Sequence, residues 1–210
     1  IVESVKTSLK RLRIERLGAC LIHVETDIQY VGILKKLETQ GLIGGAGISL
    51  DTNQYCDDII ARGIKYVQLP YNIMDQRFDA FFPKAQANGV SVFTRSAYLQ
   101  GLLIMPEDKI MPDLSEVIPV RRRLGKLAAD AGLSMTELCI RFVLSNPAVS
   151  SILTGVDNAN QLRQNGKLLE KGPLPATLFQ EVKAVVPRLA ENIIRPFFWK
   201  KNADDVWNKA

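Results

Sequence analysis

The stretch YVQLPYNIMDQRFDAFFPKAQANGVSVFTRS (residues 66–96) places two short apolar runs on either side of one helix-like segment. The runs at 66–72 and 90–96 have the length of buried strands, and the segment at 75–89 has the length of a helix. A strand, a helix and a second strand in succession are the pattern of a βαβ unit, in which the two strands run parallel. This stretch therefore predicts an α/β fold with a parallel sheet.

The same alternation continues along the chain in both directions. Further runs of strand length occupy residues 19–24, 44–50 and 150–156. Further helical segments occupy residues 27–41, 51–63, 115–132, 134–147, 158–172 and the region from about Thr177 onward. Five such βα units fit either an open doubly wound sheet or part of a (β/α)8 barrel. No low-complexity linker interrupts them, so we expect residues 1–210 to form a single domain.

Polar residues and glycines mark the expected helix ends. Asp27, Asp51 and Ser134 each stand near the start of a helical segment, where a side-chain oxygen caps free backbone N–H groups. Ser134 is also followed three residues later by Glu137, which is the spacing of a capping box. Gly89 ends the helical segment of the first stretch. These residues predict where the helices begin and end.

The composition is that of an ordinary globular protein, with 47% hydrophobic and 23% charged residues and a net charge of +5. No apolar run reaches membrane-spanning length, and the first eighteen residues lack the apolar centre of a signal peptide. The basic residues are scattered without interleaved aromatic residues, which argues against nucleic-acid binding. Cys20, Cys56 and Cys139 are widely spaced, and the chain has one histidine, which argues against disulfides and a metal site. We expect a cytoplasmic protein without membrane or nucleic-acid partners.

Every predicted strand ends in a residue suited to ligand binding. The residues are His23, Ser49, Gln68 with Tyr71 and Asn72, Arg95 with Ser96, and Gly155. Because ligands gather at the carboxyl ends of parallel strands, we expect these residues to line one rim. Three of them also have a purely structural interpretation: His23 as a core histidine, Gln68 as a buried amide satisfied by backbone, and Arg95 as part of a surface salt bridge. The residues alone leave both interpretations open.

The last unit, TGVDNANQLRQN (residues 154–165), suits a phosphate group. Gly155 follows the strand and Asn158 stands near the start of a helix, so free backbone N–H groups and the helix dipole face the rim. Gln161 and Asn165 lie one turn apart on that helix. Gly101, after the fourth strand, permits close approach of the backbone to a phosphate. The alternatives are an ordinary capped helix and an ordinary turn.

Several blocks together resemble the aldo-keto reductase family, in order and at its spacings. They are ACLIHVE, GLIGGAGISL, VQLPYNIMDQR, VFTRSAYLQGLL, FVLSNPAVSSILTGVDNANQLRQN and the terminal RPFFW, and they cover nearly the whole chain. The resemblance implies a (β/α)8 barrel that binds an extended nicotinamide dinucleotide, usually NADP(H), with NAD(H) not excluded. It also implies reduction of an aldehyde or ketone carbonyl by hydride transfer, with a small carbonyl compound as substrate.

The resemblance assigns a role to each strand-end residue. His23 matches the histidine that orients and polarises the substrate carbonyl, and Ser49 and Gln68 match residues that hold the nicotinamide carboxamide. Arg95 matches the side chain placed against the nicotinamide ring. The phosphates are assigned in the same way, with Ser96, Leu99 and Gly101 in the pyrophosphate loop and Gly155, Gln161 and Asn165 at the adenosine phosphate end.

This sequence also departs from the family pattern. Leu50 stands where the family usually has Asn, which puts one carboxamide contact in doubt. Thr154 and Gln161 stand where NADP-preferring members often carry Lys or Arg, with Arg163 and Lys167 as candidate substitutes.

The resemblance also implies that part of the barrel is absent. No tyrosine here matches the family's proton-donating tyrosine, and residue 1 aligns just before the fourth barrel strand. We therefore expect strands four to eight of the barrel, with activity only in the presence of an N-terminal part. That part, or a second copy of the chain, is the expected protein partner. The competing hypothesis is a non-catalytic NADP-binding regulatory or sensor subunit of the same fold.

Overall fold

Five parallel strands form one sheet in the computed structural model, which describes residues 1–199. The strands are β1 (Cys20–Ile22), β2 (Ala46–Ser49), β3 (Tyr66–Pro70), β4 (Ser91–Arg95) and β5 (Val149–Ile152). Neighbours in the sheet follow the order of the sequence, from β1 to β5. The predicted α/β class with a parallel sheet is confirmed. Within residues 1–199 the sheet is open, because β1 and β5 do not pair with each other.

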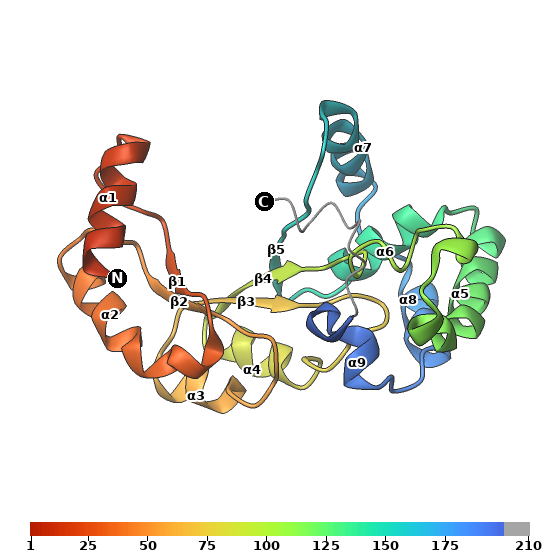
Figure 1. Cartoon of the computed structure of the whole chain (residues 1–210), viewed down its shortest axis with the longest axis horizontal. Coiled ribbons are helices and arrows are strands. Elements are labelled where there is room, and N and C mark those ends of the chain that lie inside the picture. The colour runs from red at the N-terminus through yellow and green to blue at the C-terminus, as the bar shows by residue number, and fades with distance from the viewer. Residues whose placement is uncertain (200–210) are drawn as a thin grey trace.

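Helices connect the strands, and α2, α3 and α4 lie together on one side of the sheet (Figure 1). The α-helices are α1 (Val2–Leu12), α2 (Val31–Thr39), α3 (Cys56–Ala61), α4 (Phe81–Ala87), α5 (Ile118–Asp130), α6 (Met135–Leu144), α7 (Ala159–Glu170), α8 (Ala176–Val185) and α9 (Glu191–Ile194). The 3-10 segments are η1 (Glu25–Tyr30), η2 (Glu107–Lys109), η3 (Pro112–Val117) and η4 (Pro196–Phe198). Helix α2 packs against β2, α4 against β4 and α6 against β5. None of the helices in this part of the chain combines the length and apolar composition that a bilayer crossing requires.

The two faces of the sheet differ in burial because side chains alternate along each strand. Ile48, Val67 and Val92 face the helices and are fully buried. On the opposite face, Tyr66 and Phe93 are only half-buried, and their rings stack with centroids 5.9 Å apart and planes 5° apart. This second face carries the polar strand ends described below.

Two of the predicted helix caps are wrong. Asp27 lies inside η1, and α2 begins after Tyr30 without a side-chain cap. Asp51 does not cap α3, which begins at Cys56, because its carboxylate binds arginine side chains instead. The Ser134 cap is confirmed, since its hydroxyl accepts a hydrogen bond from the Glu137 N–H at 3.1 Å.

Two predicted helices are shorter than their sequence pattern. The helix expected at 75–89 begins only at Phe81, because Asp75 forms an ion pair with Arg77 in the preceding turn. The helix expected from Thr177 ends at Val185, two residues before Pro187, where the proline ring cannot continue a helix. The chain then forms the short helices α9 and η4, and residues 200–210 of the predicted aromatic and basic tail lie outside the described residues.

Candidate functional site

The ends of β1, β2 and β3 bring three of the predicted residues together. Ser49 and Gln68 are register partners on β2 and β3, and the Ser49 hydroxyl donates to Oε1 of Gln68 at 3.4 Å. His23 directly follows Ile22, the residue of β1 that pairs with Ile48. The register therefore sets His23, Ser49 and Gln68 at the ends of three neighbouring strands.

His23 is an exposed residue at the end of β1. Among residues 1–199 its imidazole has neither a hydrogen-bond nor an ion-pair partner. The interpretation of His23 as a tolerated core residue is therefore wrong. Its ring is available to a ligand at the rim.

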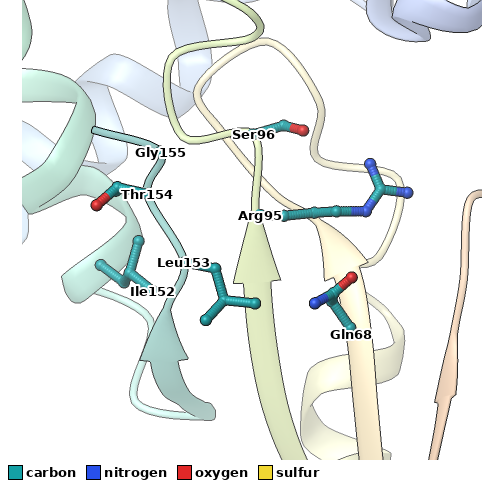
Figure 2. A pocket seen from close by; sticks show the side chains of 7 residues that line it. All are labelled: Gln68, Arg95, Ser96, Ile152, Leu153, Thr154 and Gly155. Atoms are coloured by element: carbon teal, nitrogen blue, oxygen red, sulfur yellow. The ribbon is translucent and has the colours of Figure 1, made fainter. Parts of the chain in front are cut away.

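A cavity of about 530 Å³ lies at the ends of β3, β4 and β5 (Figure 2). Its lining residues are Gln68, Arg95, Ser96, Ile152, Leu153, Thr154 and Gly155. Figure 2 shows Gln68 and Arg95 projecting to the same side of the strands, with the guanidinium of Arg95 above Gln68 in this view. Four of the predicted site residues, Gln68, Arg95, Ser96 and Gly155, thus line one cavity.

The loop after β4 has a strained backbone. Ser96, Leu99 and Gln100 have φ values of 64°, 47° and 51°, in the left-handed region that non-glycine residues rarely adopt, and Gly101 follows with φ 85°. Such strain clusters at ligand-binding sites. Within residues 1–199 the backbone N–H groups of Gln100 and Gly101 have no hydrogen-bond acceptor. This loop therefore offers free N–H groups to an anion, and Leu99 contributes only backbone because its side chain is fully buried.

The buried side chain of Asn72 holds the strained loop after β4 in place. Asn72 is fully buried in the turn after β3, and its side-chain Nδ2 donates to the carbonyl oxygen of Ser96 at 3.0 Å. Its Oδ1 accepts from the N–H groups of Met74 and Asp75 at 2.9 and 3.0 Å. One buried amide thus joins the loops that follow β3 and β4.

Arg95 is held by the loop after β2. Its Nη2 donates to the carbonyl oxygen of Leu50 at 3.1 Å and to Oδ1 of Asp51 at 3.2 Å. The Leu50 side chain is fully buried, and its backbone is engaged, with the N–H donating to the Gln68 carbonyl at 2.7 Å and the carbonyl accepting from Arg95. The salt-bridge interpretation of Arg95 is confirmed, while its contact with a planar ring stays a prediction.

Asp51 also binds an arginine from the end of the chain. Nε and Nη2 of Arg195 lie 2.8 and 2.7 Å from Oδ2 of Asp51. Partial burial acts to raise the pKa of the Asp51 carboxyl, but the hydrogen bonds and charges of Arg195 and Arg95 together outweigh it and lower the pKa. Asp51 is therefore a carboxylate at neutral pH. Sequence reasoning missed this contact, although Asp51 stands two residues beyond a strand end.

The start of helix α7 forms the far side of the rim. Oδ1 of Asn158 accepts from the N–H groups of Asn160 and Gln161 at 3.0 Å each, so these two N–H groups are not free as the sequence suggested, and the alternative of an ordinary capped helix is confirmed. Gln161 Oε1 accepts from the N–H of Asp157 at 2.8 Å. Arg163 lies about 200° around the helix from Gln161 and bonds to Asn160 at 2.8 Å, so it faces away from the Gln161 side.

Asn165 joins α7 to the loops after β4 and β5. Its Oδ1 accepts from the Tyr98 hydroxyl at 3.3 Å, and its Nδ2 donates to Oγ1 of Thr154 at 3.2 Å. Burial raises the pKa of Tyr98 to about 12, so this hydroxyl keeps its proton. The structure thus brings Asn165 to the rim, with Tyr98 as a partner that sequence reasoning did not find.

The rim as a whole suits an extended anionic ligand with a planar ring. It presents an amide and hydroxyl pair, a flat guanidinium, free N–H groups in a strained loop and a capped helix start. Within residues 1–199 no group of three or more His, Cys, Asp and Glu residues is arranged to hold a metal ion. These features define a parallel α/β protein with a candidate polar ligand site at the carboxyl ends of its strands.

Comparison with known proteins assigns this chain to a family. The sequence profile of the aldo/keto reductase family matches residues 1–187, and the chain belongs to that family. The uncharacterized oxidoreductase YqkF of Bacillus subtilis (strain 168) is 26% identical over 211 residues, covering 93% of this chain and 67% of YqkF. The L-galactose dehydrogenase of Arabidopsis thaliana is 26% identical over 183 residues, covering 78% of this chain and 56% of that protein.

A solved structure shares the fold. The holo form of aldo-keto reductase AKR11C1 from Bacillus halodurans has a TM-score of 0.77 at 24% identity, covering 92% of this chain and 69% of that chain. The chain therefore spans between 56% and 69% of the length of the relatives compared.

Proposed function

We propose that this chain carries the cofactor site of an NAD(P)H-dependent oxidoreductase that reduces the carbonyl of an aldehyde or ketone. The observation that carries the proposal is the convergence of the Ser49–Gln68 pair, Arg95, the strained loop after β4 and the start of α7 at one end of the sheet. Membership of the aldo/keto reductase family supports an oxidoreductase. The chemistry of the rim supports a nicotinamide dinucleotide as its ligand.

The residues present fit such a cofactor. The cavity of about 530 Å³ is wide and open, and it is lined by both polar and apolar side chains. Ser49 and Gln68 offer a hydroxyl and a primary amide, which can pair with both groups of a carboxamide. The free N–H groups at Gln100 and Gly101 suit a pyrophosphate. Because Ser49 and Gln68 can pair with the carboxamide, we assign the nicotinamide end of the cofactor to the ends of β2 and β3 and to Arg95.

The other end of the cofactor is assigned to β5 and α7. Gly155 is exposed and has no atom within 4 Å of the position a Cβ would take, so a phosphate can approach its backbone. Gln161 and Asn165 lie on one face of α7 beside it. We assign the adenosine phosphate to these three residues, with Ser96, Leu99 and Gly101 at the pyrophosphate.

His23 is the residue assigned to the substrate carbonyl. When bound, the reduced nicotinamide supplies the hydride for the carbonyl carbon. The exposed imidazole of His23 sits at the end of β1, beside the Ser49–Gln68 pair, where it can donate a hydrogen bond to the carbonyl oxygen. We propose that the proton reaches that oxygen from a group outside these 210 residues.

We further propose that the five strands are strands four to eight of an eight-stranded barrel. The relatives extend beyond the matched region, and the sheet described here is open at β1 and β5. The half-buried Tyr66 and Phe93 rings would then face the barrel interior. On this proposal turnover requires the rest of the barrel, and the chain alone binds the cofactor without catalysis. A cytoplasmic location and association with that remainder belong to the same proposal.

We propose NADP(H) as the preferred cofactor. NAD(H) is the alternative, and measured affinities for the two decide between them. Arg163 turns away from the Gln161 side of α7, and Lys167 lies one turn further along the Arg163 face. Neither cation therefore stands beside Gln161 to receive a 2′-phosphate. The proposed preference for NADP(H) over NAD(H) is therefore small.

The test is a titration of the purified chain with NADPH and with NADH, following the fluorescence of the reduced nicotinamide and quenching of tryptophan. The variant Gln68→Ala removes the amide assigned to the carboxamide, and Gln86→Ala is the matched control because Gln86 is exposed on α4. Saturable binding that Gln68→Ala weakens and Gln86→Ala preserves supports the proposal. A folded wild-type chain that binds neither cofactor contradicts it.

A further inference from the structure

Arg95 crosses the rim of the sheet from β4 to the loop after β2. Figure 2 shows its side chain extending from the end of β4 past β3, on the side to which Gln68 projects. Its Nη2 reaches the carbonyl oxygen of Leu50 at 3.1 Å and Oδ1 of Asp51 at 3.2 Å. The guanidinium is therefore fixed at its far end, over the strand that carries Gln68.

The Asp51 carboxylate is itself fixed by a second arginine. Oδ2 of Asp51 accepts a hydrogen bond from Nε of Arg195 at 2.8 Å and lies 2.7 Å from its Nη2, while Oδ1 accepts from Arg95. Nη1 of Arg195 binds Oε2 of Glu191 at 2.7 Å, and its guanidinium carbon lies 4.8 Å from the Phe198 ring centre. Each carboxylate oxygen of Asp51 thus has its own arginine.

The backbone of Asp51 is held from the other side. Oε2 of Glu25 accepts from the N–H groups of Asp51 and Thr52 at 2.7 and 2.9 Å, and Oε1 accepts from the Thr52 hydroxyl at 2.8 Å. Glu25 stands two residues after His23 in the loop that follows β1. A connected set of contacts therefore runs from the His23 loop through Asp51 to Arg95.

We infer that Asp51 is a positioning residue that holds the guanidinium of Arg95 in place for the nicotinamide ring. The inference rests on the proposed function, and it assigns a role to a carboxylate that lies outside the residues assigned to the cofactor. An arginine side chain loses rotamer entropy when it is ordered, and this loss opposes binding. Asp51 orders it before the cofactor arrives, so ring binding does not bear that cost.

The charge of Asp51 gives the inference a second consequence. Arg95 alone would place a positive charge beside the ring, which is itself positive when oxidised and neutral when reduced. The Asp51 carboxylate offsets part of the Arg95 charge at close range. Loss of that carboxylate should therefore weaken binding of NADP⁺ more than binding of NADPH.

The experiment compares ligands with and without the nicotinamide ring. Affinities for NADP⁺, NADPH and 2′-phospho-ADP-ribose are measured for the wild-type chain and for Asp51→Asn; ADP-ribose and NAD⁺ replace the phosphorylated ligands if the chain selects NADH. Asp57→Asn is the matched control, because Asp57 is 84% exposed and pairs with Lys84 on the helical side. We expect Asp51→Asn to weaken NADPH binding about tenfold, the size of one lost charge-assisted hydrogen bond, and NADP⁺ binding more.

Binding of the ring-free ligand separates positioning from general damage. It should stay within about twofold of wild type in Asp51→Asn, because only the ring end loses a contact. Equal weakening of all three ligands, or no change in any, overturns the inference. If Asp51→Asn fails to fold by circular dichroism, Arg195→Gln decides, with a smaller loss for NADPH and none for the ring-free ligand. A wild-type chain that binds no dinucleotide contradicts the proposed function instead.

Discussion

Arg95 and Arg195, a hundred residues apart in sequence, bind opposite oxygens of the same Asp51 carboxylate. One arginine comes from the end of a central strand and the other from the segment between α9 and η4. Asp51 follows β2, so its carboxylate joins the C-terminal segment to the rim of the sheet. The stability of this junction and the geometry of the candidate site therefore depend on one ionised group.

This dependence predicts a loss of stability in acid. The pKa of Asp51 is lowered by its two arginines against the effect of burial, and the pKa of Glu137 is lowered by Lys171 and Arg141. A carboxyl whose pKa is lower in the folded state than in the unfolded state stabilises the fold at pH values above its unfolded pKa. The unfolded pKa is about 3.8 for Asp51 and 4.5 for Glu137. The stabilisation is lost as the pH falls through the pKa of the folded state.

Urea unfolding measured from pH 7 down to about pH 2.5 should show a flat free energy of unfolding above about pH 5 and a fall below it. We expect these two groups to account for a measurable part of the fall. The double variant Asp51→Asn with Glu137→Gln is less stable at pH 7 and loses less stability in acid than wild type. Parallel pH profiles of wild type and double variant would contradict the assignment.

Asn72→Ala should destabilise the chain strongly. The substitution leaves the buried Met74 N–H without an acceptor. It also removes one of the two hydrogen bonds made by the Asp75 N–H and one of the two accepted by the Ser96 carbonyl. One unpaired buried N–H and two further lost hydrogen bonds give a loss of about 2–3 kcal/mol in the free energy of unfolding, measured in urea. Asn88→Ala, an exposed amide bonded to the Lys84 carbonyl, is the control and should cost less than about 1 kcal/mol. Similar losses in both variants would show that Asn72 is not the anchor of the loop after β4.

Gly47→Ala and Gly125→Ala should change stability in opposite directions. A Cβ at Gly47 would come within 2.7 Å of both the Leu21 side chain and the Tyr66 carbonyl oxygen, so the backbone of β2 or β3 must move. We expect a loss of about 1–3 kcal/mol. Gly125 lies inside α5 with nothing within 4 Å of the same position, and alanine there should add up to about 1 kcal/mol of stability. Thermal melting of the two variants measures both changes, and a stabilised Gly47→Ala would show that the β2–β3 spacing is wrong.

The sequence was sufficient to predict the sheet because its signals are local. Each strand is a short apolar run between helical segments, and β3 and β4 fall within the runs at 66–72 and 90–96. Strand-end position was equally informative for the site, since Gln68, Arg95 and Gly155 do line one cavity. Parallel strands necessarily bring their carboxyl ends to one edge of the sheet.

Asp51 shows where local reasoning stops. An aspartate just before a helical segment is a common helix cap, so its short-range pattern favours that role. Its actual partners come from β4 and from a segment 144 residues further along the chain. Only the tertiary fold brings Arg195 to that carboxylate. The same holds for Tyr98 and Asn165, which meet across 67 residues.

His23→Ala should separate catalysis from cofactor binding. His23 is exposed at the end of β1 and does not line the cavity formed by Gln68, Arg95 and Gly155, so its removal leaves the proposed cofactor contacts in place. In a protein that contains the whole barrel, we expect turnover of a small aldehyde to fall about 100-fold, the size of one lost hydrogen bond to a developing oxyanion. The dissociation constant for NADPH should stay within about threefold of wild type, because that contact forms only with the substrate. His23→Gln, which keeps a donor at this position, should recover part of the turnover. Equal losses in turnover and NADPH affinity would place His23 with the cofactor contacts rather than at the carbonyl.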